Sequence, residues 1–396
     1  MASFIKYFCF CICMLSIPLM AAQAQSLSNN NQIITGADRT EEYLPYLKGK
    51  RIAIMANPTS IIGEKHLVDS LQSLGVEIVK VFGPEHGFRG NVGAGAHVKD
   101  EIDSKTGIPI VSLYGAKRKP SKEDLENVDL LIYDLQDVGC RFYTNINALV
   151  RLMEACHENN LELLILDRPN PNGYLIDGPV LDMKYKSGIG QFPIPMSHGL
   201  TVAEFAMMAN GEGWLEDKVQ CKLKIIPVAN YTHDMPYTLP VSPSPHLNTQ
   251  QAVLLYPSTC MFEGTYVNHG RGTYFPFTVF GSPAYKGIYS FSYTPKSIKG
   301  MSTSPLFMDQ VCYGLDLRNY DTDLKWIMEL YKNSPEKEKF FDGSLSKQMN
   351  NIEIQIGSGL FRQQIIDGVP ESEIRASWEP GLSNYKLMRK KYLLYP

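Results

Sequence analysis

The chain has 396 residues, 44% of them apolar and 20% charged, and its formal net charge is −3. This composition is typical of a folded globular protein and excludes intrinsic disorder and collagen-like repeats. The slightly acidic balance gives no basic surface for nucleic acid, and the length is typical of two domains.

The first 24 residues have the pattern of a secretory signal peptide. Lys6 is the single charge before an apolar run over 7–20, and residues 22–24 (AQA) are the small residues that a signal peptidase accepts. The run is shorter than the ~20 apolar residues of a membrane-spanning helix. We therefore expect cleavage near Ala24, a secreted or periplasmic mature chain without a membrane span, and a lead-in over 25–48.

The cysteines indicate packing rather than crosslinking. Three of the eight lie in the signal segment, and the others are far apart and form no C-x-x-C pair. This spacing gives neither a disulfide framework nor a zinc site, so we expect small buried apolar side chains, with a single disulfide as the alternative. These cysteines are Cys140, Cys156, Cys221, Cys260 and Cys312.

Short apolar runs alternate with segments of helical spacing over residues 49–190. Each run is continuously apolar, which is typical of strands buried on both faces of a parallel sheet. The alternation predicts an α/β domain with helices on both sides of the sheet. The expected strands cover 51–56, 76–82, 109–114, 129–135 and 161–166, and the expected helices cover 66–74 and 145–158.

The alternation of apolar runs and helical segments stops after residue 190. The pattern of residues 191–396 predicts a mixed α+β domain. Helical spacing covers 201–214 and 321–332, a strand is expected at 223–228, and 277–293 is aromatic-rich and β-like. The chain is therefore expected to be a parallel-sheet domain followed by a mixed domain.

Polar residues follow the expected strands, and in an open parallel sheet ligands bind outside the carboxyl ends of the strands. Glu85 follows the second strand in a turn rich in proline and glycine, where a crowded carboxyl group is suited to acid–base chemistry. A loop salt bridge of Glu85 with Arg89 or His86 is the alternative. Neither G-x-G-x-x-G nor a P-loop follows a strand, which argues against a nucleotide cofactor.

The fourth strand ends in a second polar segment. Asp134, Asp137 and Arg141 can bind the hydroxyl groups of a polyol or orient another acid, and an internal Asp–Arg pair explains them equally well. Tyr143 follows them and can stack on a sugar ring, since glycosidases combine carboxylates with aromatic side chains.

Further candidate groups lie in loops beyond this segment. Glu263 precedes a glycine-rich stretch in which Arg271, between two glycines, is free to reach a carboxylate. Arg168, Asn170 and His198 lie in two other turn-rich loops. No histidine spacing indicates a catalytic metal and no G-x-S-x-G segment supports a serine hydrolase, so neither a metal nor another cofactor is expected.

Together these segments resemble the bacterial exo-β-N-acetylmuramidase family of the NamZ type. The resemblance extends over nearly the whole mature chain, and its motifs are long and jointly specific. The segments that carry it are PEHGFRG (84–90), DLQDVG (134–139), LDRPNP (166–171), IDGPVLD (176–182), FEGT (262–265), GRGT (270–273) and RKKYLLY (389–395).

The resemblance implies a glycoside hydrolase that releases N-acetylmuramic acid from the non-reducing end of peptidoglycan fragments, in cell-wall turnover or recycling. It also implies a Rossmann-like parallel-sheet domain plus a smaller mixed α/β domain, with the active site in the cleft between them. We expect these domains at 49–190 and 191–396.

A glycosidase normally needs one carboxylic acid to protonate the leaving oxygen and a second carboxylate as nucleophile or base. Glu85 is the first choice for the acid, and Glu263, Asp134 and Asp137 are the candidates for the second group. Retention, inversion and assistance by the N-acetyl group of the substrate all stay open at this point.

N-acetylmuramic acid also carries a lactyl carboxylate, which needs a cation in the site. The candidates are Arg271, Arg141 and Arg168, in that order. The other candidates for substrate binding are His86, Arg89, Tyr143, Asn170 and His198.

Two other functions are weighed against hydrolysis. A periplasmic muropeptide-binding protein without catalysis would use the same cleft, but several fixed carboxylates would repel an acidic ligand. An amidase acting on the stem peptide would need zinc or an activated nucleophile, and no such group of residues is evident.

Overall fold

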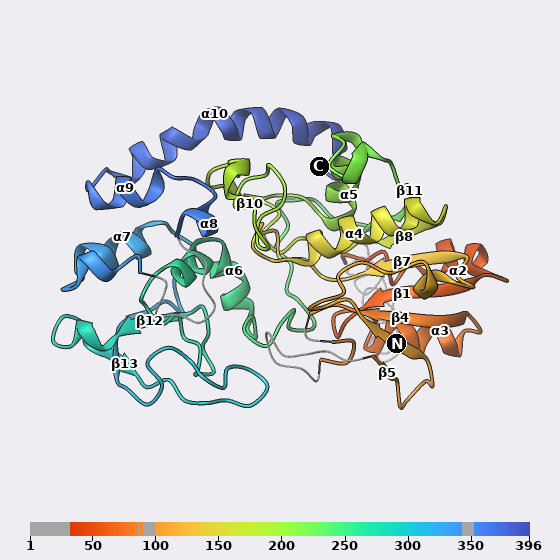
Figure 1. The fold of residues 1–396 in the computed structure, drawn as a ribbon, viewed down its shortest axis with the longest axis horizontal. Helices are drawn as coiled ribbons and strands as arrows, with labels where there is room; N and C mark the ends of the chain where they lie inside the picture. Colours follow the sequence, from red (N-terminus) through yellow and green to blue (C-terminus); the bar gives the residue numbers. More distant parts are fainter. Residues whose placement is uncertain (1–31, 86, 91–99, 343–351) are drawn as a thin grey trace, which may run out of the picture.

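The computed structural model describes residues 32–85, 87–90, 100–342 and 352–396. The expected signal peptide and His86 lie outside the described residues. A large sheet with its helices forms one part of the molecule, and a smaller region with its own antiparallel sheet forms the other (Figure 1). The expected two-part α/β architecture is therefore confirmed.

Seven strands form the large sheet, in the order β11-β8-β7-β1-β4-β6-β5. All neighbours pair in parallel except the β5–β6 edge pair. Numbered along the chain, the parallel strands run 6-5-4-1-2-3 across the sheet, which is the doubly wound Rossmann order. The strands are β1 (Arg51–Ala56), β4 (Glu77–Gly83), β5 (Glu101–Ile102), β6 (Pro109–Ser112), β7 (Leu130–Asp134), β8 (Glu162–Leu166) and β11 (Lys222–Ile226).

Alternate residues of these strands enter two different hydrophobic cores, one on each face of the sheet. In β1, Ala53 and Met55 belong to the core that contains helices α4 (Asn145–Glu158) and α5 (Val202–Gly211). Ile52 and Ile54 face the other core, which is covered by α2 (Thr40–Leu47) and α3 (Leu67–Ser73). Burial on both faces explains why the strands read as continuous apolar runs.

The C-terminal region has a third core, rich in aromatic side chains. Its antiparallel sheet has the order β12-β14-β13. The elements are β12 (Val279–Ser282), β13 (Phe291–Tyr293), β14 (Cys312–Asp316), α6 (Gln250–Thr259), α7 (Lys325–Lys332), α8 (Ile352–Ile356) and α9 (Phe361–Ile366). Two short antiparallel pairs lie elsewhere, β2 (Ile61–Ile62) with β3 (Lys65–His66) and β9 (Ile176–Asp177) with β10 (Ser197–His198).

Helix α10 (Glu371–Arg389) joins the two parts, and it runs along the top of the molecule in Figure 1. Trp378 packs in the C-terminal core, while Tyr385 packs in a core of the sheet domain and donates to His198 O at 2.7 Å. The chain then returns to the sheet edge, where the Tyr395 hydroxyl donates to Asp167 Oδ2 at 2.6 Å. This last segment holds the two parts together.

The sheet extends past residue 190, because β11 adds to its edge and α5 covers one face. The boundary expected between 49–190 and 191–396 stays a prediction. The five mature-chain cysteines are free and buried, as expected. Within the described residues, no helix has the length and apolar character needed to cross a membrane.

Candidate active site

A pocket of about 630 Å³ lies between the carboxyl ends of the sheet strands and the C-terminal region. The sheet side supplies the turns after β4 and β6 and the first turns of α4. The C-terminal side supplies Tyr256, Glu263, Arg271 and Phe277. This position agrees with the expected cleft between the domains and with the general location of ligands in open parallel sheets.

Glu85 reaches the pocket because β4 ends just before it. Gly83 of β4 is paired with Ser112 of β6, so Glu85 and Tyr114 each lie two residues beyond one register position. The Glu85 side chain is half-buried, and no cationic nitrogen of the described residues lies within 4 Å of its carboxylate. Burial, together with the charge and hydrogen bonding of Glu85, raises the pKa of Tyr114 to about 12.

Glu263 lies in the 3₁₀ turn Cys260–Gly264 that follows α6, on the opposite wall. Arg271 Nη2 is 2.5 Å from Glu263 Oε1, and Gln355 Nε2 donates to Oε2 at 3.3 Å. Burial opposes ionisation of Glu263, but the charge and hydrogen bond of Arg271, together with the hydrogen bond from Gln355, outweigh it and hold the pKa of Glu263 below its usual range. Glu263 is therefore an ionised carboxylate at neutral pH.

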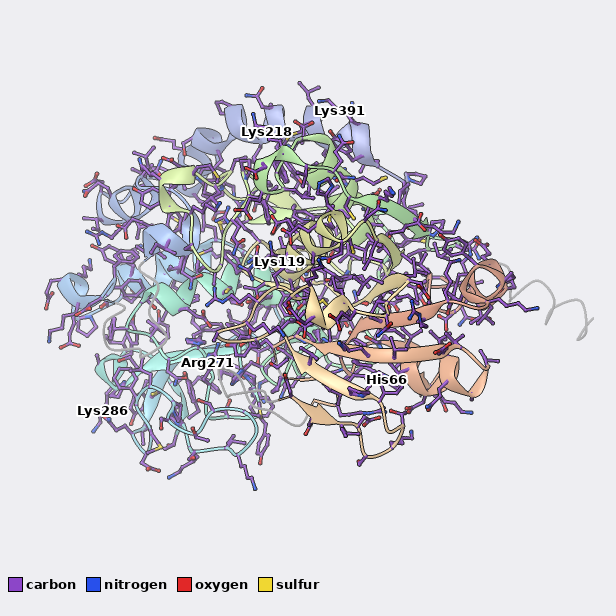
Figure 2. All side chains as sticks on the ribbon, turned by 45° about the vertical axis from the view of Figure 1, so that its right-hand side comes forward. His66, Lys119, Lys218, Arg271, Lys286 and Lys391 are labelled. Atoms are coloured by element: carbon purple, nitrogen blue, oxygen red, sulfur yellow. The ribbon has the colours of Figure 1, made fainter. Side chains whose placement is uncertain are left out.

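Arg271 has several partners on its own side of the pocket. Its Nε donates to His269 Nε2 at 2.7 Å, and its Nη1 is 3.0 Å from His246 Nδ1. Burial and the charge of Arg271 lower the pKa of His269 to about 4, so this imidazole is neutral. Figure 2 labels Arg271 within the C-terminal region, from which it contributes to the pocket lining. The positive charge of Arg271 is therefore neutralised by the carboxylate of Glu263.

Aromatic side chains line the part of the pocket between the two carboxylates. Tyr143 donates from its hydroxyl to Pro243 O at 2.7 Å, and its ring meets Tyr256 edge to face with centroids 6.5 Å apart. Phe142 and Phe277 also line the pocket. These rings offer the apolar faces that a sugar ring can contact.

Asp134 and Arg168 form an internal pair rather than part of the pocket lining. Arg168 Nε and Nη2 donate to the two carboxylate oxygens of Asp134 at 2.6 and 2.9 Å. Both side chains are at most 2% exposed, and Arg168 also donates to Ile61 O. The internal Asp–Arg pair considered from the sequence therefore exists, with Arg168 as the cation instead of Arg141.

Asp137, Asn170 and His198 are buried together in loops outside the pocket lining. Asp137 Oδ1 accepts from Gly139 N at 2.7 Å and lies 3.7 Å from His198 Nε2. Asn170 Nδ2 donates to Leu200 O at 3.0 Å. Gly139 has a φ of +76°, and a Cβ atom there would lie 2.4 Å from the Asn170 side chain, so the loops fit closely.

The two remaining candidate arginines, Arg89 and Arg141, also bind groups outside the pocket lining. Arg89 pairs with Asp69 and Asp103, at 2.8 and 2.7 Å, instead of with Glu85. Arg141 is 1% exposed, and burial lowers its pKa to about 9. Its guanidinium donates to four backbone carbonyl oxygens, those of Pro179, Ile194, Gln355 and Ile356.

The pocket thus unites Glu85, Tyr143, Glu263 and Arg271 among the predicted residues. Sequence reasoning missed other residues that line it. The carboxyl-end rule, applied to the third strand as well, points to the loop with Tyr114 and Arg118. The spacing of helix α4 places a further group on the pocket-facing side, namely Thr144, Asn147, Ala148 and Arg151.

Comparisons with known proteins agree with this architecture. The N-terminal family model of exo-β-N-acetylmuramidase NamZ matches residues 52–251, and the C-terminal model matches residues 254–395. Peptidoglycan β-N-acetylmuramidase NamZ of Bacillus subtilis (strain 168) is 35% identical over 98% of this chain and 99% of the relative.

Two crystal structures of DUF1343 family proteins from Bacteroides fragilis NCTC 9343 are also similar. BF0379 is 45% identical with a TM-score of 0.84, covering 92% of this chain and 99% of that one. BF0371 is 28% identical with a TM-score of 0.76, covering 92% and 100%. With both family models matched in order along one chain, this protein belongs to the NamZ family of exo-β-N-acetylmuramidases.

Proposed function

We propose that this protein is an exo-acting β-N-acetylmuramidase that hydrolyses the β-glycosidic bond of non-reducing-end N-acetylmuramic acid in peptidoglycan fragments. The single observation that carries the proposal is the pair Glu85 and Glu263 in one pocket. The two carboxylates come from different parts of the molecule and have different surroundings. Glycosidases use two such groups in different roles.

In the proposed mechanism Glu85 protonates the leaving oxygen. It is half-buried and free of a cation among the described residues, whereas Glu263 is held ionised by Arg271. An ionised Glu263 suits a nucleophile, a base for water or a counter-charge to the oxocarbenium-like transition state. Assistance by the substrate's N-acetyl group is the alternative, in which Glu263 would only stabilise charge.

The proposed cellular role is turnover or recycling of the cell wall by an exported enzyme. It rests on the signal-like segment 1–24 and on the substrate named for the Bacillus subtilis relative. Protein sequencing of the mature N-terminus tests the export step, with cleavage after Ala24 as the expected result.

Hydrolysis is tested with an aryl β-N-acetylmuraminide, with the matching N-acetylglucosaminide as the control substrate. Release of the aryl alcohol from the first substrate alone is expected. A muropeptide-binding protein would instead bind the muraminide and release nothing, and Glu85→Gln would then not change the outcome.

A further inference from the structure

The charges around the pocket leave two cations without a carboxylate partner. Among the described residues, the charged residues of its lining are Glu85, Arg118, Arg151, Glu263 and Arg271. The last two neutralise each other at 2.5 Å. Every Asp and Glu of the chain is among the described residues, because 1–31, 86, 91–99 and 343–351 contain none. Among the described ion pairs within 4 Å, neither Arg118 nor Arg151 takes part in one.

The surroundings of Arg151 keep it unpaired. Glu154, one turn further along α4, accepts a hydrogen bond from Glu216 N at 3.0 Å instead of pairing with Arg151. Burial and the charge of Arg118 both lower the pKa of Arg151, so the two guanidinium groups lie near enough to repel each other. Glu154 offsets part of this repulsion without forming an ion pair, and Arg118 is exposed while Arg151 is half-buried. Two like charges that line one pocket and form no ion pair are an arrangement that an anionic ligand stabilises.

Two further features of this corner bear on the ligand that it would bind. Thr144, Asn147 and Arg151 line the pocket at successive turns, so the N-terminal end of the fourteen-residue helix α4, with its partial positive charge, opens into it. Asn147 is 2% exposed, and its Nδ2 donates to Gly188 O at 2.9 Å while its Oδ1 has no hydrogen-bond partner among the described residues. That acceptor is available to a hydroxyl or amide N–H of the ligand.

The corner formed by Arg118, Asn147 and Arg151 is one side chain, that of Tyr114, away from the proposed acid Glu85. Tyr114 interacts with both Glu85, which raises its pKa, and Arg118, which lowers it. In N-acetylmuramic acid the lactyl ether on C3 carries a carboxylate on the same sugar ring as the bond that is cut. Arg118 and Arg151 line the same pocket as Glu85, so a sugar bound with its glycosidic oxygen at Glu85 can direct its lactyl carboxylate toward them.

We propose that Arg118 and Arg151 form the anion subsite that binds the free lactyl carboxylate of N-acetylmuramic acid and so distinguish muramides from glucosaminides. The proposal rests on the proposed hydrolase function and replaces Arg271, Arg141 and Arg168 as candidates for this contact. The guanidinium fork suits bidentate pairing with a carboxylate.

The test measures kcat and KM of the wild type, Arg151→Gln and Arg118→Gln/Arg151→Gln on three substrates. These are the aryl β-N-acetylmuraminide, its lactyl methylamide and a muropeptide with a stem peptide. Lys119→Gln is the matched control, because Lys119 pairs with Glu158 at 2.6 Å and is not among the lining residues.

We expect Arg151→Gln to raise KM for the free acid about 10- to 100-fold, with a larger effect in the double variant. KM for the methylamide should be high in the wild type and unchanged in the variants, and Lys119→Gln should match the wild type. Wild-type KM values in the double variant would overturn the proposal. A loss confined to the muropeptide would also overturn it, since the bound carboxylates would then belong to the stem peptide.

Absence of turnover by the wild type would contradict the hydrolase function and not the subsite. Calorimetric binding of free N-acetylmuramic acid then decides the subsite. Weaker binding by the double variant than by Lys119→Gln supports it, and equal binding overturns it.

Discussion

The two walls of the pocket present the same kind of side chain in different surroundings. On the sheet side, Glu85 follows a parallel strand and has no cation of the described residues within 4 Å. On the C-terminal side, Glu263 is fixed by Arg271 and Gln355, with its pKa held low. The contrast shows that neighbouring groups, rather than residue type, divide the proposed roles between two glutamates.

The cations are divided between the walls in the same way as the carboxylates. The C-terminal wall contains a paired arginine, Arg271, whereas the sheet wall contains Arg118 and Arg151 without a paired carboxylate. The sheet wall therefore offers the substrate unpaired charges of both signs, whereas the two charges of the C-terminal wall neutralise each other. Variants of these groups test the contrast between the two walls.

Glu85→Gln should have the largest effect, because it removes the proton donor while keeping size and polarity. We expect kcat on a muramic-acid-containing disaccharide to fall about 10²- to 10⁴-fold, with binding nearly unchanged. Glu101→Gln, an exposed residue of edge strand β5, is the matched control. A variant that keeps more than a tenth of the wild-type kcat would remove Glu85 from proton transfer.

Arg271→Gln should damage both activity and stability, because it leaves Glu263 buried without its counter-charge. We expect a loss of about 3–5 kcal/mol in the free energy of unfolding, measured by chemical denaturation, and a fall in kcat. The double variant Glu263→Gln/Arg271→Gln should recover most of the stability but not the activity. Full activity of Arg271→Gln would argue against a catalytic role for an ionised Glu263.

Arg168→Gln should affect stability alone, because the Asp134–Arg168 pair does not line the pocket. Loss of a buried partner should lower the free energy of unfolding by about 3–5 kcal/mol, while KM of the remaining folded enzyme stays at the wild-type value. A raised KM with normal stability would instead return Arg168 to substrate binding.

Asp167 should give an effect that appears only as a pH dependence of stability. Burial raises the pKa of Asp167 from 3.8 to about 7, so the folded state holds a proton that the unfolded chain releases near pH 4. The stabilisation of the folded state by this proton is fully present below about pH 4 and is lost as the pH rises through about 7. Denaturation of the wild type and Asp167→Asn between pH 4 and 8 should give diverging curves, and parallel curves would contradict this assignment.

Much of the fold could be predicted from the sequence, because burial on both sides of a parallel sheet leaves a strong apolar pattern. The strand Arg51–Ala56 and the helix Asn145–Glu158 have the predicted bounds. The place of β11 in the sheet could not be predicted in this way. Its apolar segment follows an irregular stretch, and the strand that it pairs with, β8, is distant in the sequence. Spatial neighbours of that kind have no local sequence signal.

The site was predictable only in part, for a related reason. Glu85 and Glu263 could be selected because each lies in a turn where the backbone exposes a carboxylate. The partners of the arginines could not be predicted. Arg141 donates to backbone carbonyl groups, and Arg168 pairs with Asp134, which follows a different strand. The sequence around Arg118 and Arg151 is typical of exposed segments, and their proximity is evident only from the pocket that both of them line.

The central claim is that Glu85 is the proton donor to the leaving oxygen, and the dependence of its variant on the leaving group tests it most directly. The measurement compares the loss caused by Glu85→Gln on an activated aryl muraminide with the loss on the natural disaccharide. An acid is needed most where the leaving group is poor, so the account predicts a much larger loss of kcat on the disaccharide. An equal loss on both substrates would contradict it.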